Sequence, residues 1–178
     1  SGSVEITGCD IRKSETFKKH LGLVTQERSL FRDLNAYENL EFISVLKDAG
    51  KGNIPELIKR FELDSILGEP AGTLDAGIYQ RLSMACALIN KPRLLIADDL
   101  INGIDPYSRR IVLKELYSFI SGGGACIWGF SRVEFCSLTS RVGWLENGLL
   151  TLYSPREAQE LWESRIRLIE QQSGDSDA

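Results

Sequence analysis

An apolar strand that ends in two adjacent acids constrains the fold of this chain more than any other stretch of its sequence. Residues 93–97 (RLLIA) run directly into Asp98 and Asp99, and helical patterns at 78–90 and 108–120 flank the strand. Alternation of strand and helix predicts an α/β layered fold with a parallel sheet, in which ligands bind at the carboxyl ends of the strands. An Asp at a strand end can also simply cap the next helix, so the acid pair alone leaves both interpretations open.

Composition narrows the class of protein without identifying it. The 178 residues carry 21 basic and 25 acidic side chains, a net charge of −4, and 43% of them are hydrophobic. This is typical of a globular domain, and the acidic balance argues against a nucleic-acid partner. No apolar run is long enough to span a bilayer. The four cysteines have no metal-like spacing, which favours reduced thiols in a cytosolic protein: Cys9, Cys86, Cys126 and Cys136.

The remaining periodicity predicts further elements on both sides of this strand. Strand patterns cover 4–6, 21–26, 125–130, 142–145 and 149–153, and helical patterns cover 36–47, 53–61, 133–140 and a last helix from 155. Asn53 and Asp75 stand where helix caps are expected. Residues 36–90 therefore form a helical insert in the layered sheet, and the polar tail 173–178 is predicted to be disordered.

Four further stretches stand at ordered distances from the acid pair. They are LGLVTQERSLFRDLNAYENLEF (21–42), LDAGIYQRLSMACALINKP (74–92), LINGIDPYSRR (100–110) and IWGFSRVEFCSLTSRVGWLENG (127–148). With them the sequence resembles the nucleotide-binding domain of ABC transporter ATPases, most closely the ABC-2 exporter branch, from Ser1 to about Trp162. The resemblance implies a P-loop NTPase-like sheet with an inserted helical subdomain, as a partial domain over 1–172.

The resemblance assigns residues to metal binding and catalysis, with ATP and Mg²⁺ as the implied cofactors. Gln26 occupies the position that contacts Mg²⁺ and senses the transmembrane partner. Asp98 occupies the position of the metal-binding acid. Asp99 stands where the family has its catalytic Glu, and Phe130 stands where the family has its switch His.

A second group of positions corresponds to the family's contacts with nucleotide across a dimer of such domains. The signature loop, usually Leu-Ser-Gly-Gly, matches Leu74, Asp75, Ala76 and Gly77, and the loop that crosses the dimer matches Ile104-Asp105-Pro106. The implied partners are a second nucleotide-binding domain and a transmembrane exporter subunit that contacts the surface near 28–39. The implied location is cytoplasmic, peripheral at the inner face of the membrane.

The departures from the family pattern all concern phosphate chemistry. The string Gly-x-x-x-x-Gly-Lys-Ser/Thr, whose backbone cradles the phosphates, occurs nowhere in the chain, and in the family it would precede the equivalent of Ser1. Asp75 replaces a Ser, and a carboxylate can only accept hydrogen bonds. Ala76 adds a Cβ where Gly allows close approach. Asp99 is one methylene shorter than Glu, and Phe130 has no hydrogen-bonding group.

Each departure also has a purely structural interpretation. Asp75 is well placed to cap the helix at 78–90, and Phe130 could be a core residue at a strand end. A one-residue shift of the alignment would place Ser131 at the switch position instead. Gln26 could be an ordinary loop residue.

Three functions therefore compete at this point. The first is a degenerate cassette that supports a partner cassette or membrane subunit and is inactive alone. The second is a fragment of an active ABC transporter ATPase that begins before Ser1. The third is an Mg²⁺-dependent phosphohydrolase in which Asp98, Asp99 and Asp105 form a metal cluster. The lack of a phosphate-loop unit further predicts that the chain exposes an apolar edge of its sheet.

Overall fold

A computed structural model describes residues 2–12 and 16–174 of the chain. The contacts between residues divide the chain into two compact units, Ser1–Gly129 and Phe130–Ala178. The sequence predicted a single domain over 1–172. That domain stays a prediction; the boundary between the two units falls directly after the last strand of the central sheet, and each unit is described by itself.

The first unit is built on a parallel sheet of three strands. These are β3 (Leu21–Val24), β4 (Leu94–Asp98) and β5 (Ala125–Gly129), paired in the order β3-β4-β5. Val24 pairs with Ala97, and Asp98 pairs with Gly129. The predicted parallel α/β sheet is confirmed, with the acid pair at the carboxyl end of its central strand.

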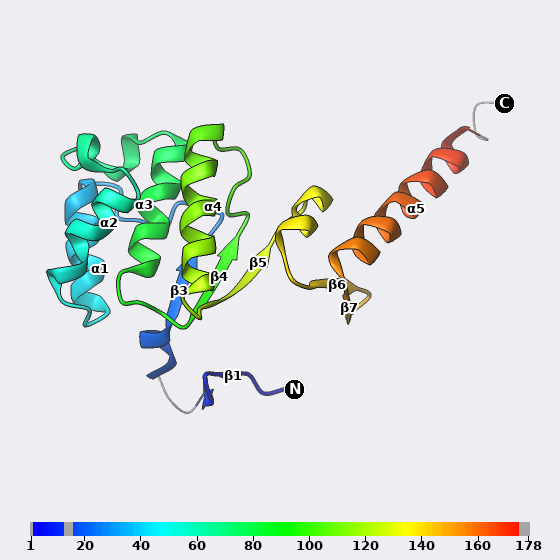
Figure 1. The fold of residues 1–178 in the computed structure, drawn as a ribbon, viewed down its shortest axis with the longest axis horizontal. Coiled ribbons are helices and arrows are strands. Elements are labelled where there is room, and N and C mark those ends of the chain that lie inside the picture. The colour runs from blue at the N-terminus through cyan, green and yellow to red at the C-terminus, as the bar shows by residue number, and fades with distance from the viewer. Residues whose placement is uncertain (1, 13–15, 175–178) are drawn as a thin grey trace. The chain divides into compact units, whose positions relative to one another are not determined.

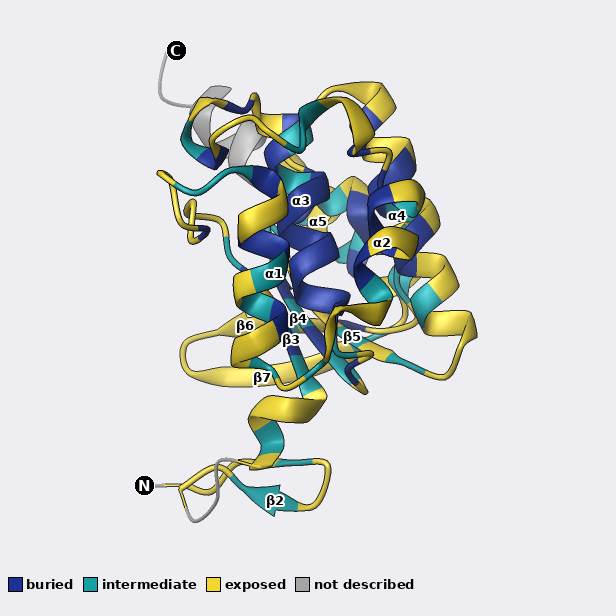
Figure 2. Cartoon of the chain, turned by 90° about the vertical axis from the view of Figure 1, so that its left-hand side faces the viewer, coloured by how far each residue is buried: buried dark blue, intermediate teal, exposed yellow. Residues whose placement is uncertain are grey.

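Helices connect these strands (Figure 1). Between β3 and β4 lie α1 (Ala36–Leu46), η2 (Lys51–Asn53), α2 (Ile54–Arg60), η3 (Asp64–Ile66), η4 (Ala71–Thr73) and α3 (Ala76–Leu88), and between β4 and β5 lies α4 (Pro106–Ser121). Figure 2 shows α3 as a largely buried helix with α1, α2 and α4 around it. Gly22 of β3 allows the close approach of α3, because a Cβ there would lie 2.7 Å from the Ala87 carbonyl oxygen.

The two faces of the sheet differ in how they are covered. Val24, Leu95 and Ala97 are buried on one face. On the other face Leu23 of β3 and Ile127 of β5 are 53% and 60% exposed. Parallel sheets in folded domains are normally covered on both faces. The apolar exposure seen here lies on a face of the sheet, whereas the sequence predicted it at an edge, so the exposed edge stays a prediction.

A short N-terminal hairpin precedes the sheet. Strands β1 (Glu5–Ile6) and β2 (Cys9–Asp10) pair antiparallel around Thr7 and Gly8, both of which adopt positive φ. The 3₁₀ helix η1 (Thr16–His20) then leads into β3.

The second unit combines an antiparallel hairpin with a long helix. Its elements are η5 (Val133–Leu138), β6 (Val142–Glu146), β7 (Leu149–Tyr153) and α5 (Pro155–Gly174). Asn147 and Gly148 form the predicted turn, with φ of 50° and 78°. Cys136, Val142 and Ala158 form a small core. Helix α5 runs two residues into the tail expected from 173, and 175–178 lie outside the described residues.

Candidate functional site

Asp99 is held by three contacts at the point where β4 ends. Its φ of +52° turns the chain out of the strand, and Asp tolerates this left-handed conformation better than most residues. Its N–H donates to the Gly129 carbonyl at 2.9 Å. Its carboxylate Oδ2 accepts from Gln26 Nε2 at 3.2 Å and from Asn102 Nδ2 at 3.3 Å. The structure therefore brings the predicted residues Gln26 and Asp99 together.

Oxygen atoms without protein partners remain beside these contacts. Asp99 Oδ1 is buried and has no hydrogen-bond partner. The Asp98 carboxylate is exposed at the end of β4 and forms no ion pair with any described residue. Mg²⁺ is usually bound by one or two carboxylates together with water and phosphate oxygens. Asp98 and Gln26, with Asp99 beside them, supply donors that suit this ion.

The predicted metal cluster of a phosphohydrolase does not form. No group of three acidic, histidine or cysteine side chains in the described part of the chain could hold a metal ion. Asp105 is occupied elsewhere, because its Oδ1 accepts the Ser108 N–H at 2.9 Å and so caps α4. That backbone hydrogen bond is the main reason that the pKa of Asp105 is lowered. The alternative built on Asp98, Asp99 and Asp105 is therefore wrong.

The signature residues mark the start of a helix rather than a free loop. Asp75 is the N-cap of α3, and its Oδ1 accepts the Ile78 N–H at 2.8 Å. Ala76 and Gly77 belong to the first turn of α3, whereas the sequence predicted a loop up to Gly77. Leu74 is buried, and its carbonyl accepts from Arg28 Nη2 at 2.9 Å.

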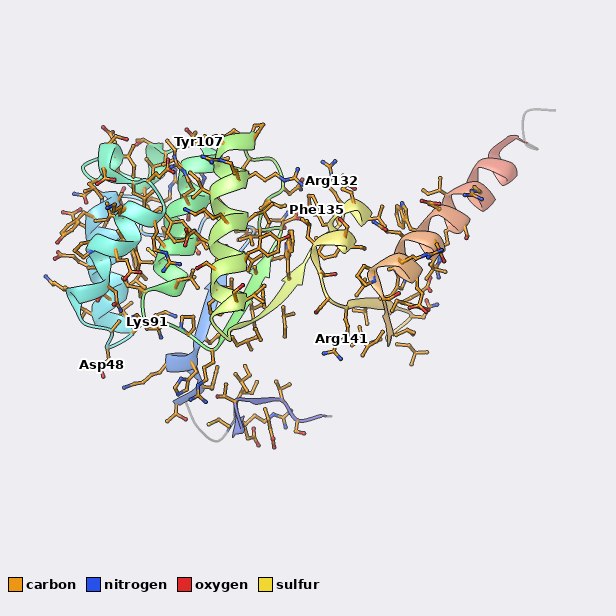
Figure 3. The ribbon with its side chains drawn as sticks, viewed as in Figure 1. Asp48, Lys91, Tyr107, Arg132, Phe135 and Arg141 are labelled. Carbon is orange, nitrogen blue, oxygen red and sulfur yellow. The ribbon has the colours of Figure 1, made fainter. Side chains whose placement is uncertain are left out.

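Gly77 is packed against the cap of the next helix. A Cβ at this position would lie 2.0 Å from Asp105 Oδ2 and 2.5 Å from Ser108 Oγ. The structure therefore joins two of the predicted motifs, the signature and the dimer-crossing loop, within one chain. Directly after that loop, Tyr107 at the start of α4 donates its hydroxyl proton to Glu62 (Figure 3).

A small pocket connects the acid to the signature helix. Its volume is about 140 Å³, and its lining residues are Gln26, Arg28, Ala76, Tyr79, Gln80, Asp99, Asn102 and Ile104. Arg28 lies over the Tyr79 ring at 4.7 Å, and the Tyr79 hydroxyl accepts the Leu30 N–H at 2.8 Å. The sequence did not assign Arg28, Tyr79 or Asn102 to this site, and it placed Arg28 only on the partner-facing surface near 28–39. For Asn102 a local signal existed, since it follows Asp99 by three residues as a polar side chain in a tight turn.

Phe130 makes a contact that fits its structural interpretation. Its ring lies edge-on to Phe135 at 6.1 Å and packs on the small core of the second unit. Arg132 in turn lies 5.7 Å from the centre of the Phe135 ring, beside it in Figure 3. Ser131 is exposed. A phenylalanine in this setting offers no hydrogen bond to a phosphate.

The residues present do not supply a complete ATP site. Asp98 and Gln26 carry oxygen atoms of the kind that Mg²⁺ prefers, but none of the 178 residues belongs to a Gly-x-x-x-x-Gly-Lys-Ser/Thr loop, which provides the backbone cradle and the lysine for the phosphates. No described helix is both long and apolar enough to pass through a membrane.

Comparisons with known proteins show which family the sequence and the fold resemble. Residues 1–102 match the family model described as ABC transporter. The "Probable multidrug ABC transporter ATP-binding protein YbhF" of Escherichia coli is 31% identical over 139 residues, which are 75% of this chain and 24% of that protein. The "Lantibiotic transport ATP-binding protein SrtF" of Streptococcus pyogenes is 28% identical over 163 residues, 90% of this chain and 69% of that protein.

A solved structure shares the fold at low sequence identity. The "Structure of ATP binding subunit of ABC transporter" superposes with a TM-score of 0.79 and 18% identity, covering 92% of this chain and 71% of that one. The chain thus spans about a quarter of YbhF and about seven tenths of SrtF and of the solved subunit. The chain belongs to the ABC transporter family, and its residues form a nucleotide-binding domain of that family.

Proposed function

We propose that this domain supports transport as a cassette with little hydrolysis of its own, paired with a second nucleotide-binding domain. The observation that carries the proposal is the role of Asp75. A serine at an N-cap accepts the backbone N–H with its oxygen and keeps its O–H free to donate to a phosphate. Asp75 makes the same cap at 2.8 Å but has no proton to donate. It also adds negative charge at a surface that would meet a triphosphate.

Two further positions support the same conclusion. Asp99 carries its carboxylate one methylene closer to the backbone than a glutamate would, and Gln26 and Asn102 hold it there. A misplacement of about 1 Å can cost about a hundredfold in rate. Phe130 packs on Phe135 and has no donor for the γ-phosphate.

The cofactors of this function are ATP and Mg²⁺, placed between this chain and its partner cassette. Asp98 and Gln26 would hold the metal ion, which when bound neutralises charge on the phosphate oxygens. Leu74 to Gly77 and Asp105 would face the nucleotide from this chain. The phosphate loop would come from a polypeptide segment other than these 178 residues.

The names of the relatives suggest the direction of transport. Their names refer to a multidrug transporter, to lantibiotic transport and to linearmycin resistance. We infer an exporter, with this domain peripheral at the cytoplasmic face of the membrane. Its transmembrane subunit would contact the surface near 28–39.

The test uses the assembled transporter with its partner domain and membrane subunit. Hydrolysis of ATP is compared between the unaltered complex and one carrying Asp75→Ser, Asp99→Glu and Phe130→His. The proposal expects a rise of at least tenfold, because each change restores a contact to the reacting phosphate. The matched control is Asp64→Glu, which lengthens an exposed acid elsewhere. Equal rates before and after the triple change would refute the proposal.

One observation favours the alternative of an active ATPase in this same family. Gln26, Asp98 and Asp99 retain an acid pair and an amide together at the sheet edge. If the unaltered complex hydrolyses ATP at this site, Asp98→Asn in this chain will abolish that portion of the activity. If this chain only supports its partner, Asp98→Asn will leave the rate nearly unchanged.

A further inference from the structure

We propose that Glu62 and Tyr107 are positioning residues, whose hydrogen bond fixes the dimer-crossing loop 104–106 relative to the start of α3. Neither side chain would touch the nucleotide. Both would act through Asp105, which in the proposed function faces the nucleotide together with residues 74–77. The inference rests on that function and adds two positions to which the family resemblance assigns no role.

The turn 60–62 at the end of α2 carries the acceptor of this bond. Helix α2 ends at Arg60, and Glu62 follows with a φ of +53°, at a place where helices usually have glycine or asparagine. This conformation is strained for a residue with a Cβ, so it persists only where the surrounding contacts enforce it. The Glu62 carboxylate accepts the hydroxyl proton of Tyr107 from the first turn of α4. The strained backbone therefore aims this carboxylate at α4.

Two buried charged side chains hold the same turn in place. Arg60 Nε donates to Glu115 Oε2 of α4 at 2.7 Å, and Glu115 is buried. Arg81 of α3 is also buried, and its Nη1 lies 3.1 Å from the carbonyl oxygens of both Phe61 and Glu62. Removing one partner of a buried pair leaves an uncompensated charge, which is strongly destabilising. These contacts therefore keep the turn against α3 and α4 even when the bond to Tyr107 is absent.

Helix α4 meets the turn along one face. Tyr107, Ile111 and Glu115 follow one another at intervals of four residues, which places them on the same side of the helix. Ile111 and Glu115 are buried, whereas Tyr107 is 52% exposed at the start of α4 (Figure 3). The hydrogen bond to Glu62 is the main reason that the pKa of Tyr107 is raised, so the hydroxyl keeps its proton and can donate. Tyr107 therefore ties down the end of α4 that directly follows the dimer-crossing loop.

Together these contacts form a closed frame around that loop. Gly77 in the first turn of α3 packs on Asp105, since a Cβ there would lie 2.0 Å from Asp105 Oδ2. Arg81 joins α3 to the turn, and Glu62 joins the turn to Tyr107, two residues after Asp105. The start of α3 and the loop are thus presented as one preformed surface, which loses less entropy on binding than a mobile one.

Four variants separate the hydrogen bond from the fold. Tyr107→Phe removes only the hydroxyl and keeps the ring beside Arg110, whose guanidinium lies 5.2 Å from the ring centre. Glu62→Gly removes the acceptor but suits the positive φ, so the fold should be at least as stable as before. Glu62→Gln keeps an acceptor oxygen and should restore the behaviour of the unaltered chain. The matched control is Tyr117→Phe, because Tyr117 is another exposed tyrosine of α4.

The first measurement is hydrogen exchange at the Ser108 amide of the full chain. This N–H donates to Asp105 Oδ1 at 2.9 Å and so reports on the position of the loop. We expect about fivefold faster exchange in Tyr107→Phe and Glu62→Gly. Glu62→Gln and Tyr117→Phe should exchange like the unaltered chain. Unchanged exchange in Tyr107→Phe would show that the bond does not position the loop, and the inference would be wrong.

The second measurement is binding of ATPγS with Mg²⁺ to the assembled transporter, by equilibrium dialysis. Tyr107→Phe and Glu62→Gly should each raise the Kd about fivefold, and Glu62→Gln should leave it unchanged. A role in stability alone predicts instead that affinity follows the unfolding temperature. Glu62→Gly separates the two, because it should retain or raise the unfolding temperature while it weakens binding.

The outcomes separate this inference from the proposed function. If the unaltered complex binds ATPγS and Tyr107→Phe and Glu62→Gly bind it equally well, the inference is wrong and the proposed function stands. The inference is also wrong if Glu62→Gln weakens binding as much as Glu62→Gly. If the unaltered chain does not assemble with a second nucleotide-binding domain, or the complex does not bind ATPγS, the proposed function fails. In that case the nucleotide role of Glu62 and Tyr107 fails with it, whatever the exchange at Ser108 shows.

Discussion

The cap at Asp75 yields a quantitative prediction, because the same side chain carries a structural and a functional role. Asp75 Oδ1 accepts a single backbone N–H, that of Ile78, at 2.8 Å. Loss of such a cap typically costs about 1 kcal/mol. Loss of a negative charge at a helix N-terminus adds about 0.3 kcal/mol at an exposed site. Asp75→Ala should therefore lower the free energy of unfolding of the first unit by about 1.3 kcal/mol, whereas Asp75→Ser should change it by less than about 0.5 kcal/mol.

Hydrogen exchange at the Ile78 amide is the direct assay of this cap. A loss of about 1.3 kcal/mol in local stability corresponds to roughly ninefold faster exchange. We expect this acceleration for Asp75→Ala and little change for Asp75→Ser, and urea unfolding should rank the variants in the same order. Asp64→Ala serves as the control, because Asp64 is an exposed acid that makes no side-chain cap.

Two results would refute this reasoning. Unchanged Ile78 exchange in Asp75→Ala would mean that the cap is not made in solution. A serine variant as unstable as the alanine variant would mean that the cap depends on charge, and that the aspartate is required for the fold. In that case the replacement of the signature serine would have a structural cause, and the argument for reduced hydrolysis would lose its main support.

Three further predictions follow from packing and charge. Gly77→Ala should destabilise the first unit by about 1–3 kcal/mol in urea unfolding, because its Cβ would lie 2.0 Å from Asp105 Oδ2; an unchanged midpoint would contradict the packing. The Arg165 guanidinium lies 2.6 Å from both carboxylate oxygens of Glu146 and lowers the pKa of the Glu146 carboxyl group. This ion pair therefore stabilises the fold above the unfolded pKa of about 4.3, and its contribution is lost as the pH falls through the lowered folded pKa. Glu146→Gln should therefore be less stable than the unaltered chain at pH 7, and the difference should shrink as the pH falls below about 4.3; a difference that stays constant down to acid pH would exclude the ion pair as the cause. Ile127→Thr should reduce self-association in light scattering, because it removes a 60% exposed apolar side chain from the open sheet face while keeping β propensity; unchanged association would place the contact elsewhere.

Local signals in the sequence predicted the features that depend on neighbouring residues. The strand that ends at Asp98, the cap at Asp75 and the turn at Asn147-Gly148 all follow from short-range rules. The cap predicted at Asn53 is wrong, since its side chain donates to the Ile89 carbonyl at 3.0 Å and makes no cap. A partner 36 positions away competes for the amide, and no local pattern reveals that competition.

In the candidate site too, some contacts could be predicted from the sequence and others, made between distant residues, could not. That Gln26 and Asp99 meet could be predicted, because both follow parallel strands and so stand at one edge of the sheet. The bond from the Leu30 N–H to the Tyr79 hydroxyl could not, because it links the loop after β3 to the first turn of α3, 49 positions away. Asp105 carried a local signal that the resemblance obscured, since an Asp before a Pro and three residues before a Ser is typical of an N-cap.

The surroundings of Ala76 and Gly77, the two residues after Asp75, differ in a way that explains why only one of them departs from the Gly-Gly of the signature. Ala76 is exposed and lines the pocket near Asp99, so its Cβ occupies space that a ligand would otherwise approach. Gly77 is buried against Asp105 and Ser108, so a Cβ there would displace the cap of α4. The position that faces the pocket has lost its glycine, and the position that faces the chain itself has kept it. Asp75 shows the same contrast between internal and ligand contacts. It keeps the hydrogen bond that caps its own helix, and it lacks only the proton that a phosphate oxygen would accept. At these three positions, contacts internal to the domain account for what matches the signature, and the proposed departures fall where the domain would meet the nucleotide.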